Sequence, residues 1–225
     1  MASFTRSFKL LLVVGLITGL HVSLYSVSPY PAAARPRSWR TVFQPWLNRK
    51  DPGKKGEGGT RDGACLITPR RNQPLWNTRP VFVWQGDRRI MAVRQASKDG
   101  ILFKQTASPG KERLQRLRYD GEPLQAGKTY EWLFFITPSL PLQIKPIPFQ
   151  IMEDRDRAPI TADLQALEQR LTAQNASREE IARQRADYFA QRQLWADMLQ
   201  EVYGIDEPSE ELKLELNTLL KNACS

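Results

Sequence analysis

Cysteine and histidine are almost absent from this chain of 225 residues. It contains two cysteines, Cys65 and Cys224, and a single histidine, His21. Beyond residue 34 the sequence therefore offers neither zinc-ligand spacing nor a Cys–His nucleophile. It also lacks a Gly-x-Ser-x-Gly elbow, and the glycine-rich stretch 53–63 runs into an apolar segment without the ending of a phosphate-binding loop. These absences predict a protein that is not an enzyme and uses no cofactor or metal, with an unrecognised hydrolase as the catalytic alternative.

Long hydrophobic runs are also scarce, and the one strong run lies at the N-terminus. Arg6 and Lys9 precede an apolar stretch over residues 10–20, which continues in weaker form to residue 27, and the alanines 32–34 follow. A basic region, a short apolar region and a small-residue cleavage site are typical of a signal peptide. We expect residues 1–34 to be removed and the protein to be periplasmic or extracellular. The alternative is a retained membrane anchor over residues 10–27, since a spanning helix needs roughly 20 apolar residues.

Charge is divided unevenly along the rest of the chain. Residues 35–157 contain 24 Lys and Arg against 12 Asp and Glu, a net charge of +12, whereas residues 158–225 contain 7 against 12, a net charge of −5. A basic part indicates solvated strand faces, contact with an anionic membrane surface or acidic polymer, or docking onto the acidic part. Because export argues against nucleic acid, we expect none as a partner.

The basic part supplies the only candidate binding residues that the sequence singles out. Paired and alternating arginines could together form an anion-binding face on a β-sheet. The candidates are Arg70, Arg71, Arg88, Arg89, Arg113, Arg116 and Arg118.

Short apolar runs separated by turn residues fill the region 64–157. They are residues 65–67, 81–84, 90–93, 101–103, 114–119, 129–136 and 147–152. About seven short strands with turn signals at near-regular spacing are typical of an antiparallel sandwich. In the run 129–136, Tyr130, Trp132, Phe134 and Ile136 would share one face while Leu133 and Phe135 make the other apolar, so we expect a central strand with Trp84 packed across from it. The prolines that follow, between residues 138 and 148, indicate an exposed loop or edge that is a candidate binding surface.

The period becomes helical in the acidic region 158–225. Ile160, Leu164, Leu167 and Leu171 form a one-sided stripe, and Ser177 with Glu180 makes a capping box at the start of the next helix. Further apolar residues follow up to Gly204, and a last helix is expected after Pro208. The pattern resembles a single tetratricopeptide-like helix pair, which predicts either a cap on the sandwich or a peptide-binding surface.

The complete expectation is an α+β fold in which an immunoglobulin-like antiparallel sandwich precedes a small C-terminal region of helical hairpins. Residues 35–63 are expected to form a Pro/Gly-rich basic leader, interrupted by Trp39, Phe43, Trp46 and Leu47, which either fix the leader onto the domain or touch a partner. The cysteines lie near opposite ends of the chain after residue 34. We therefore expect a buried Cys65, a free Cys224 and no disulfide.

Three segments carry a family resemblance: the run 58–65, the Gly127-Lys128-Thr129-Tyr130-Glu131-Trp132 run, and the stretch 187–199. In that order they resemble a mainly cyanobacterial family of exported proteins, the domain of unknown function 928, over residues 58–220. The resemblance implies a periplasmic or envelope location, no known activity and no catalytic residues. Members of that family often carry a second cysteine near the end of the strand after Gly127, and residues 134–137 supply none here.

Together these observations predict a non-catalytic structural or interaction module of the cell envelope, with an envelope protein as its partner. The alternative is a binder of an acidic polysaccharide or anionic membrane surface that works through the arginines named above.

Overall fold

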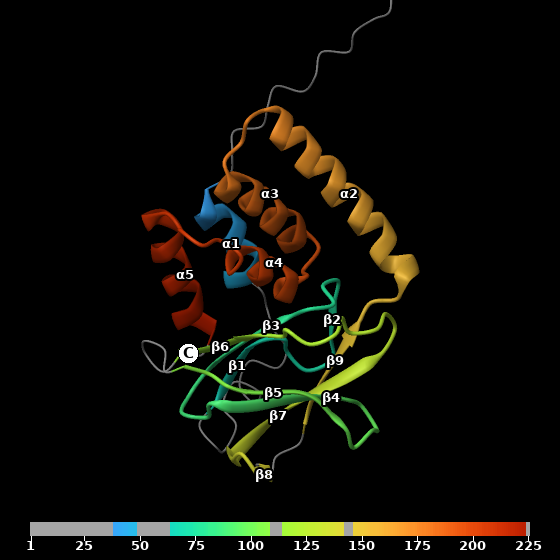
Figure 1. Cartoon of the computed structure of the whole chain (residues 1–225). Helices are drawn as coiled ribbons and strands as arrows, with labels where there is room; N and C mark the ends of the chain where they lie inside the picture. The colour runs from blue at the N-terminus through green and yellow to red at the C-terminus, as the bar shows by residue number, and fades with distance from the viewer. Residues whose placement is uncertain (1–37, 49–63, 109–113, 142–145, 224–225) are drawn as a thin grey trace, which may run out of the picture. The chain divides into compact units, whose positions relative to one another are not determined.

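The computed structural model describes residues 38–48, 64–108, 114–141 and 146–223, all of which belong to the compact unit Arg35–Ser225. These residues form two β-sheets and five helices, so the fold is α+β (Figure 1). In chain order the elements are α1 (Trp39–Leu47), β1 (Cys65–Thr68), β2 (Gln73–Leu75), β3 (Val81–Gln85), β4 (Ile90–Gln95), β5 (Ile101–Thr106), β6 (Leu114–Arg118), β7 (Thr129–Thr137), β8 (Leu140–Pro141), β9 (Ile147–Ile151), α2 (Asp154–Ala173), α3 (Arg178–Gln191), α4 (Trp195–Val202) and α5 (Glu210–Ala223).

One sheet is antiparallel and the other is mixed. The three-stranded sheet has the order β1-β3-β6, and both of its pairings are antiparallel. The six-stranded sheet has the order β2-β9-β7-β4-β5, with β8 added beside β7, and β2 runs parallel to β9. The expectation of a purely antiparallel sandwich was therefore wrong for this sheet. Strand β2 has only three residues, one of them Pro74, which is too short to produce an alternating pattern in the sequence.

The central strand of the three-stranded sheet, β3, is buried on both faces. From β3, Val81 and Val83 enter a core shared with the helices, which we call the helical core, while Phe82 and Trp84 enter a core shared with the six-stranded sheet, the sandwich core. All four residues are at most 2% exposed. A strand buried on both faces needs a continuous apolar run rather than alternation, which is what Val81-Phe82-Val83-Trp84 supplies.

The sandwich core is dominated by aromatic rings. The ring of Trp84 lies 6.0 Å from that of Trp132 and 5.4 Å from that of Phe134, both in edge-on geometry. Strand β7 lies between β4 and β9, so the expectations of a central strand and of Trp84 packing across from it are confirmed. Ile136, expected on the buried face, is 46% exposed because it lies near the end of β7, beyond the last residue paired with β4.

The helices pack on the outer face of the three-stranded sheet (Figure 1). Leu164 and Leu171 of α2 are buried and Ile160 and Leu167 are partly buried, so the predicted stripe is confirmed. Helix α2 begins at Asp154, so the boundary expected at residue 157 falls inside it. Residues Asp154 and Asp156 lie in its first turn, where negative charge is favourable for the helix dipole.

Helix α1 shows that the helices are not confined to the C-terminus. It lies in the segment expected to be a leader, and its side chains Trp39, Val42, Phe43 and Trp46 are all buried in the helical core. Their spacing of three, four and seven residues places them on one face, and Ser38 caps the helix through a 3.3 Å hydrogen bond from the Thr41 amide. Of the two roles expected for these aromatic residues, fixing the segment onto the domain is the one observed.

The disulfide expectation was also wrong, because Cys65 is disulfide-bonded. The chain has one other cysteine, Cys224, which lies outside the described residues. The Cys65 sulfur lies 3.8 Å from the carbonyl oxygen of Ala223, so the C-terminal end of α5 packs beside the start of β1. Residues at the two ends of a chain become neighbours only through tertiary packing, which their separation in the sequence does not reveal.

Candidate functional site

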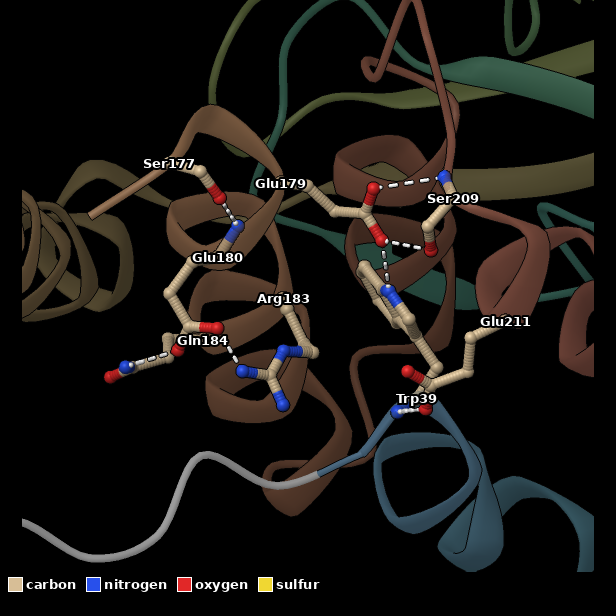
Figure 2. Close-up of polar contacts among 8 residues, drawn as sticks. All are labelled: Trp39, Ser177, Glu179, Glu180, Arg183, Gln184, Ser209 and Glu211. Carbon is tan, nitrogen blue, oxygen red and sulfur yellow. Dashed lines mark hydrogen bonds and ion pairs between the residues drawn. The ribbon is translucent and has the colours of Figure 1, made fainter.

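The most specific polar site in the described residues is the end of the groove in which α1 lies. Helix α1 packs against both α3 and α5. Its first residue, Trp39, is 1% exposed and is contacted by two carboxylates from different helices. The backbone amide of Trp39 donates to Glu211 Oε1 at 3.0 Å, and its indole Nε1 donates to Glu179 Oε1 at 2.8 Å (Figure 2).

Glu179 connects three helices at this point. Besides the indole of Trp39, it accepts hydrogen bonds from the hydroxyl and the backbone amide of Ser209, at 2.6 and 2.9 Å. Ser209 in turn caps α5, since its hydroxyl accepts from the Leu212 amide at 3.2 Å. Burial alone would raise the pKa of Glu179, but the hydrogen bonds from Ser209 and Trp39 outweigh it and lower the pKa below its ordinary value of 4.5.

Of the two hydrogen bonds in the capping box predicted at Ser177, the one to the Ser177 side chain is present. The Ser177 hydroxyl accepts a 3.1 Å hydrogen bond from the Glu180 amide, as expected. The Glu180 side chain, however, turns to Arg183 and Gln184 on its own helix (Figure 2). Glu179, one residue earlier, is therefore the side chain that reaches across to α1 and α5.

A second buried carboxylate joins α4 to the connection between β2 and β3. Asp197 is 1% exposed and accepts hydrogen bonds from the backbone amides of Trp76 and Asn77, at 3.0 and 2.8 Å. The pKa of Asp197 is raised to about 7, chiefly by complete burial and also by Glu201, although the two amides and Arg157 lower it. The same connection is tied to α2, because Trp76 Nε1 donates to Thr161 Oγ1 at 3.1 Å and Arg157 Nε donates to the Trp76 carbonyl at 2.9 Å.

A guanidinium–carboxylate pair holds α3 against α4. Arg185 makes two 2.8 Å hydrogen bonds to Glu201, and a third contact of 3.2 Å reaches Glu168 on α2. The hydrogen bonds to Glu201 raise the pKa of Arg185, against the effect of its burial. Such a bidentate pair is geometrically specific, so it fixes the relative position of the helices. In each of these three clusters the ionisable groups satisfy protein donors and acceptors.

The structure distributes the candidate arginines over several elements. Arg70 lies over the Trp46 ring of α1 at 5.6 Å, and Arg116 lies over the Tyr203 ring at 4.9 Å, so both contact the helical layer. Arg71 donates to the Pro146 carbonyl at 3.1 Å. The Arg88 carbonyl accepts from the Trp84 indole at 2.6 Å. Arg89 follows Arg88 and directly precedes β4. Arg118 lies on β6 two residues beyond Arg116, and both are exposed. Arg113 lies outside the described residues.

Exposed apolar side chains gather mainly on the six-stranded sheet. Ile101 and Leu102, on the edge strand β5, are 43% and 50% exposed, and Ile136 and Leu140, in the hairpin of β7 and β8, are 46% and 49% exposed. The register places the two pairs toward opposite ends of the sheet, since Arg94 pairs with Ile101 and Ile90 pairs with Phe135. The hairpin lies in the proline-containing stretch that the sequence singled out as a candidate surface. Residues 142–145 of that stretch lie outside the described ones.

Two further findings concern the described residues. They contain no group of three or more His, Cys, Asp or Glu side chains arranged to hold a metal ion. Among the helices described, none combines the length and the hydropathy that crossing a bilayer requires.

In comparisons with known proteins, no protein-family model and no curated protein matches the chain. The resemblance to the exported cyanobacterial family therefore remains an expectation.

Sequence reasoning missed Glu179, Glu211 and Asp197 as site residues. All three lie within the first three residues of their helices, where an acidic residue is already explained by the helix dipole. The one available signal was the spacing of Trp39, Val42, Phe43 and Trp46, which indicates an amphipathic helix and hence a groove to receive it.

Proposed function

We propose that this protein is an exported, non-catalytic interaction module of the cell envelope that acts by binding another protein. The observation that carries the proposal is the groove of the helical layer, which holds α1 by buried apolar side chains and by carboxylates at one end. Helices α3 and α5 hold α1 between them, an arrangement that suits the recognition of an amphipathic helix. The basic segment, apolar run and alanines of residues 1–34 support export.

The use of the ionisable groups supports a binding role rather than a catalytic one. Asp197, Glu179 and Arg185 are each engaged by fixed donors or acceptors that hold helices and strands together. A catalytic acid or base must instead reach a substrate atom from an accessible position. The proposed module therefore changes the location or assembly of its partner and not its covalent structure.

Cell fractionation with intact-mass measurement tests the export part of the proposal. A mass that begins near Arg35 in the soluble envelope fraction supports export and release. A full-length mass in the membrane fraction supports the retained anchor over residues 10–27. Full-length protein in the cytoplasm would end the export proposal.

Site-specific photo-crosslinking in living cells tests the interaction part. A crosslinking residue is placed at Leu214, which is 65% exposed on α5, or at Leu102 on β5, with the exposed Arg155 at the start of α2 as the matched control. We expect Leu214 or Leu102 to give one discrete crosslinked envelope protein that Arg155 does not give. Equal, weak labelling from all three positions would count against an interaction module.

A second candidate function is binding of an acidic polysaccharide or an anionic membrane surface. It is favoured by Arg116 and Arg118, which are both exposed on β6, an edge strand of the three-stranded sheet. Binding of this kind weakens steeply as ionic strength rises, because the charges are solvent-exposed. Retention on an acidic polymer that is unchanged between low and high salt would argue against it.

A further inference from the structure

Helix α1 occupies its groove in the way that a bound peptide occupies a receptor. All four residues of its apolar face are at most 3% exposed, and its first amide and first indole are bound by carboxylates of α5 and α3. The chain enters and leaves α1 through residues outside the described ones, and fifteen residues, 49–63, separate it from the next described residue.

We propose that this groove is a recognition site for a tryptophan-bearing helix and that residues 38–48 of a second copy of the chain are the helix it accepts in trans. This inference rests on the proposed function for its biological meaning. It adds a binding site and the helix that occupies it. The product is a dimer in which the two copies exchange their N-terminal helices.

The groove contacts α1 through a combination of features that few helices share. Glu211 accepts from the backbone amide of the first helical residue, so it marks where a helix must begin. Glu179 accepts from an indole nitrogen, which only tryptophan offers at that position. Apolar side chains are then required three, four and seven residues further on, at the places that Val42, Phe43 and Trp46 fill. An acidic residue in the first turn would face both carboxylates, and α1 has none there.

Energetics favour a second copy over an unrelated helix. Removing one fully buried Trp or Phe side chain typically costs about 3–5 kcal/mol, so a poorly matched helix cannot displace α1. A second copy offers the same side chains in the same order, and the exchange therefore loses no contact. Only the covalent connection favours the closed monomer, and a connection of this kind typically gives an effective concentration on the order of millimolar.

The covalent structure leaves α1 free to exchange. Cys65 is disulfide-bonded, and the only other cysteine of the chain is Cys224, so both cysteines lie beyond residue 63. A single cut between residues 49 and 63 would thus leave α1 held by noncovalent contacts alone. With fifteen residues, the segment 49–63 is long enough to take a replacement sequence. It contains five of the thirteen glycines of the chain.

The first experiment uses the purified chain with residues 53–59 replaced by a specific protease site. After cleavage, the protein is taken through one cycle of unfolding and refolding with a fluorescent synthetic peptide of residues 36–50, and binding is followed by anisotropy. We expect the peptide to replace the cleaved segment in a saturable manner, and the same peptide carrying Trp39→Ala to bind at least tenfold more weakly. Glu211→Ala in the protein should weaken binding, whereas Glu122→Ala, at an exposed position between β6 and β7, should not.

The second experiment uses the uncut chain, refolded over a range of concentrations and analysed by size exclusion with light scattering. We expect a dimer whose fraction rises with the concentration during refolding. Trp39→Phe should leave that fraction unchanged, because it weakens the closed and the exchanged contacts equally. Failure of the peptide to bind the cleaved protein would overturn the recognition site. Peptide binding without any dimer up to about millimolar protein would overturn the second copy as occupant. Neither result depends on whether an envelope partner exists, so a failure here is distinguishable from a failure in the crosslinking experiment.

Discussion

The carboxylate of Glu179 lies 2.8 Å from the indole nitrogen of Trp39, although 140 positions separate the two residues in the chain. This contact joins the first turn of α3 to the first turn of α1, and Ser209 completes it from the start of α5. Three helix N-termini thus meet around a single carboxylate. Negative charge is favoured at each of them, which explains why an acidic side chain can be held there half-buried.

Removing the indole hydrogen bond should destabilise the protein measurably. Trp39→Phe keeps an aromatic ring but leaves the Glu179 carboxylate without that donor, and we expect a loss of about 2 kcal/mol in the free energy of unfolding. A double-mutant cycle with Glu179→Gln, measured by urea denaturation, should show a coupling of about 1 kcal/mol. The same cycle with Glu168→Gln should be additive, and equal coupling in both cycles would contradict a direct contact.

Glu179 should make the protein sensitive to acid. Its pKa is lowered in the folded state, so the unfolded chain binds the proton more tightly, and its contribution to stability is present above about pH 4.5 and lost as pH falls below that value. Glu179→Gln should therefore flatten the dependence of the melting temperature on pH below about 4.5. The exposed Glu207→Gln serves as the control, and a slope that is identical in both variants would exclude Glu179 as its source.

Asp197 should change the stability with pH in the opposite direction to Glu179. Its pKa is raised to about 7 in the folded state against an ordinary value of 3.8, so the folded protein binds the proton more tightly. The contribution of this group to stability is therefore largest below about pH 4 and declines as pH rises to about 7. Asp197→Asn should remove that decline, which denaturation curves at a series of pH values would reveal, while the exposed Asp206→Asn should leave it in place.

Truncation of Asp197 tests its structural role separately from its charge. Asp197→Ala leaves the buried amides of Trp76 and Asn77 without their acceptor, which should cost about 2–4 kcal/mol of unfolding free energy. Because these amides connect the β2–β3 segment to α4, hydrogen exchange at both should accelerate. Unchanged exchange at Trp76 and Asn77 would contradict this role.

The disulfide of Cys65 should contribute strongly to stability. If its partner is Cys224, the only other cysteine, the bond closes a loop of about 160 residues, and a chain-entropy argument gives an upper value of about 5 kcal/mol. Cys65→Ser, or reduction of the native protein, should lower the melting temperature. Alkylation of the unfolded, unreduced protein should label no thiol, and a labelled thiol would show that the bond is absent from the protein as isolated.

Most individual elements were predictable because their patterns are local. The runs that became β1, β3, β4, β5, β6, β7 and β9 were identified from apolar residues between turn signals, and α2 to α5 from helical spacing and caps. Strand β2 was not predicted, because three residues with a central proline show no hydrophobic alternation. It forms through its pairing with β9. Helix α1 was not predicted, because the prolines in and around it indicated an extended leader despite the helical spacing of its apolar residues.

The sequence by itself determined the basic and acidic parts, most of the strands and helices, and the aromatic residues that fill the sandwich core. Those features depend on neighbours within a few positions, where periodicity and turn chemistry act directly. Only the tertiary structure decided that β3 would be covered on both faces, that Cys65 would lie beside the end of α5, and that Glu179 would meet Trp39. Each of these contacts joins segments far apart in the chain, and their approach is set by the burial of whole apolar faces, to which no local pattern assigns a partner.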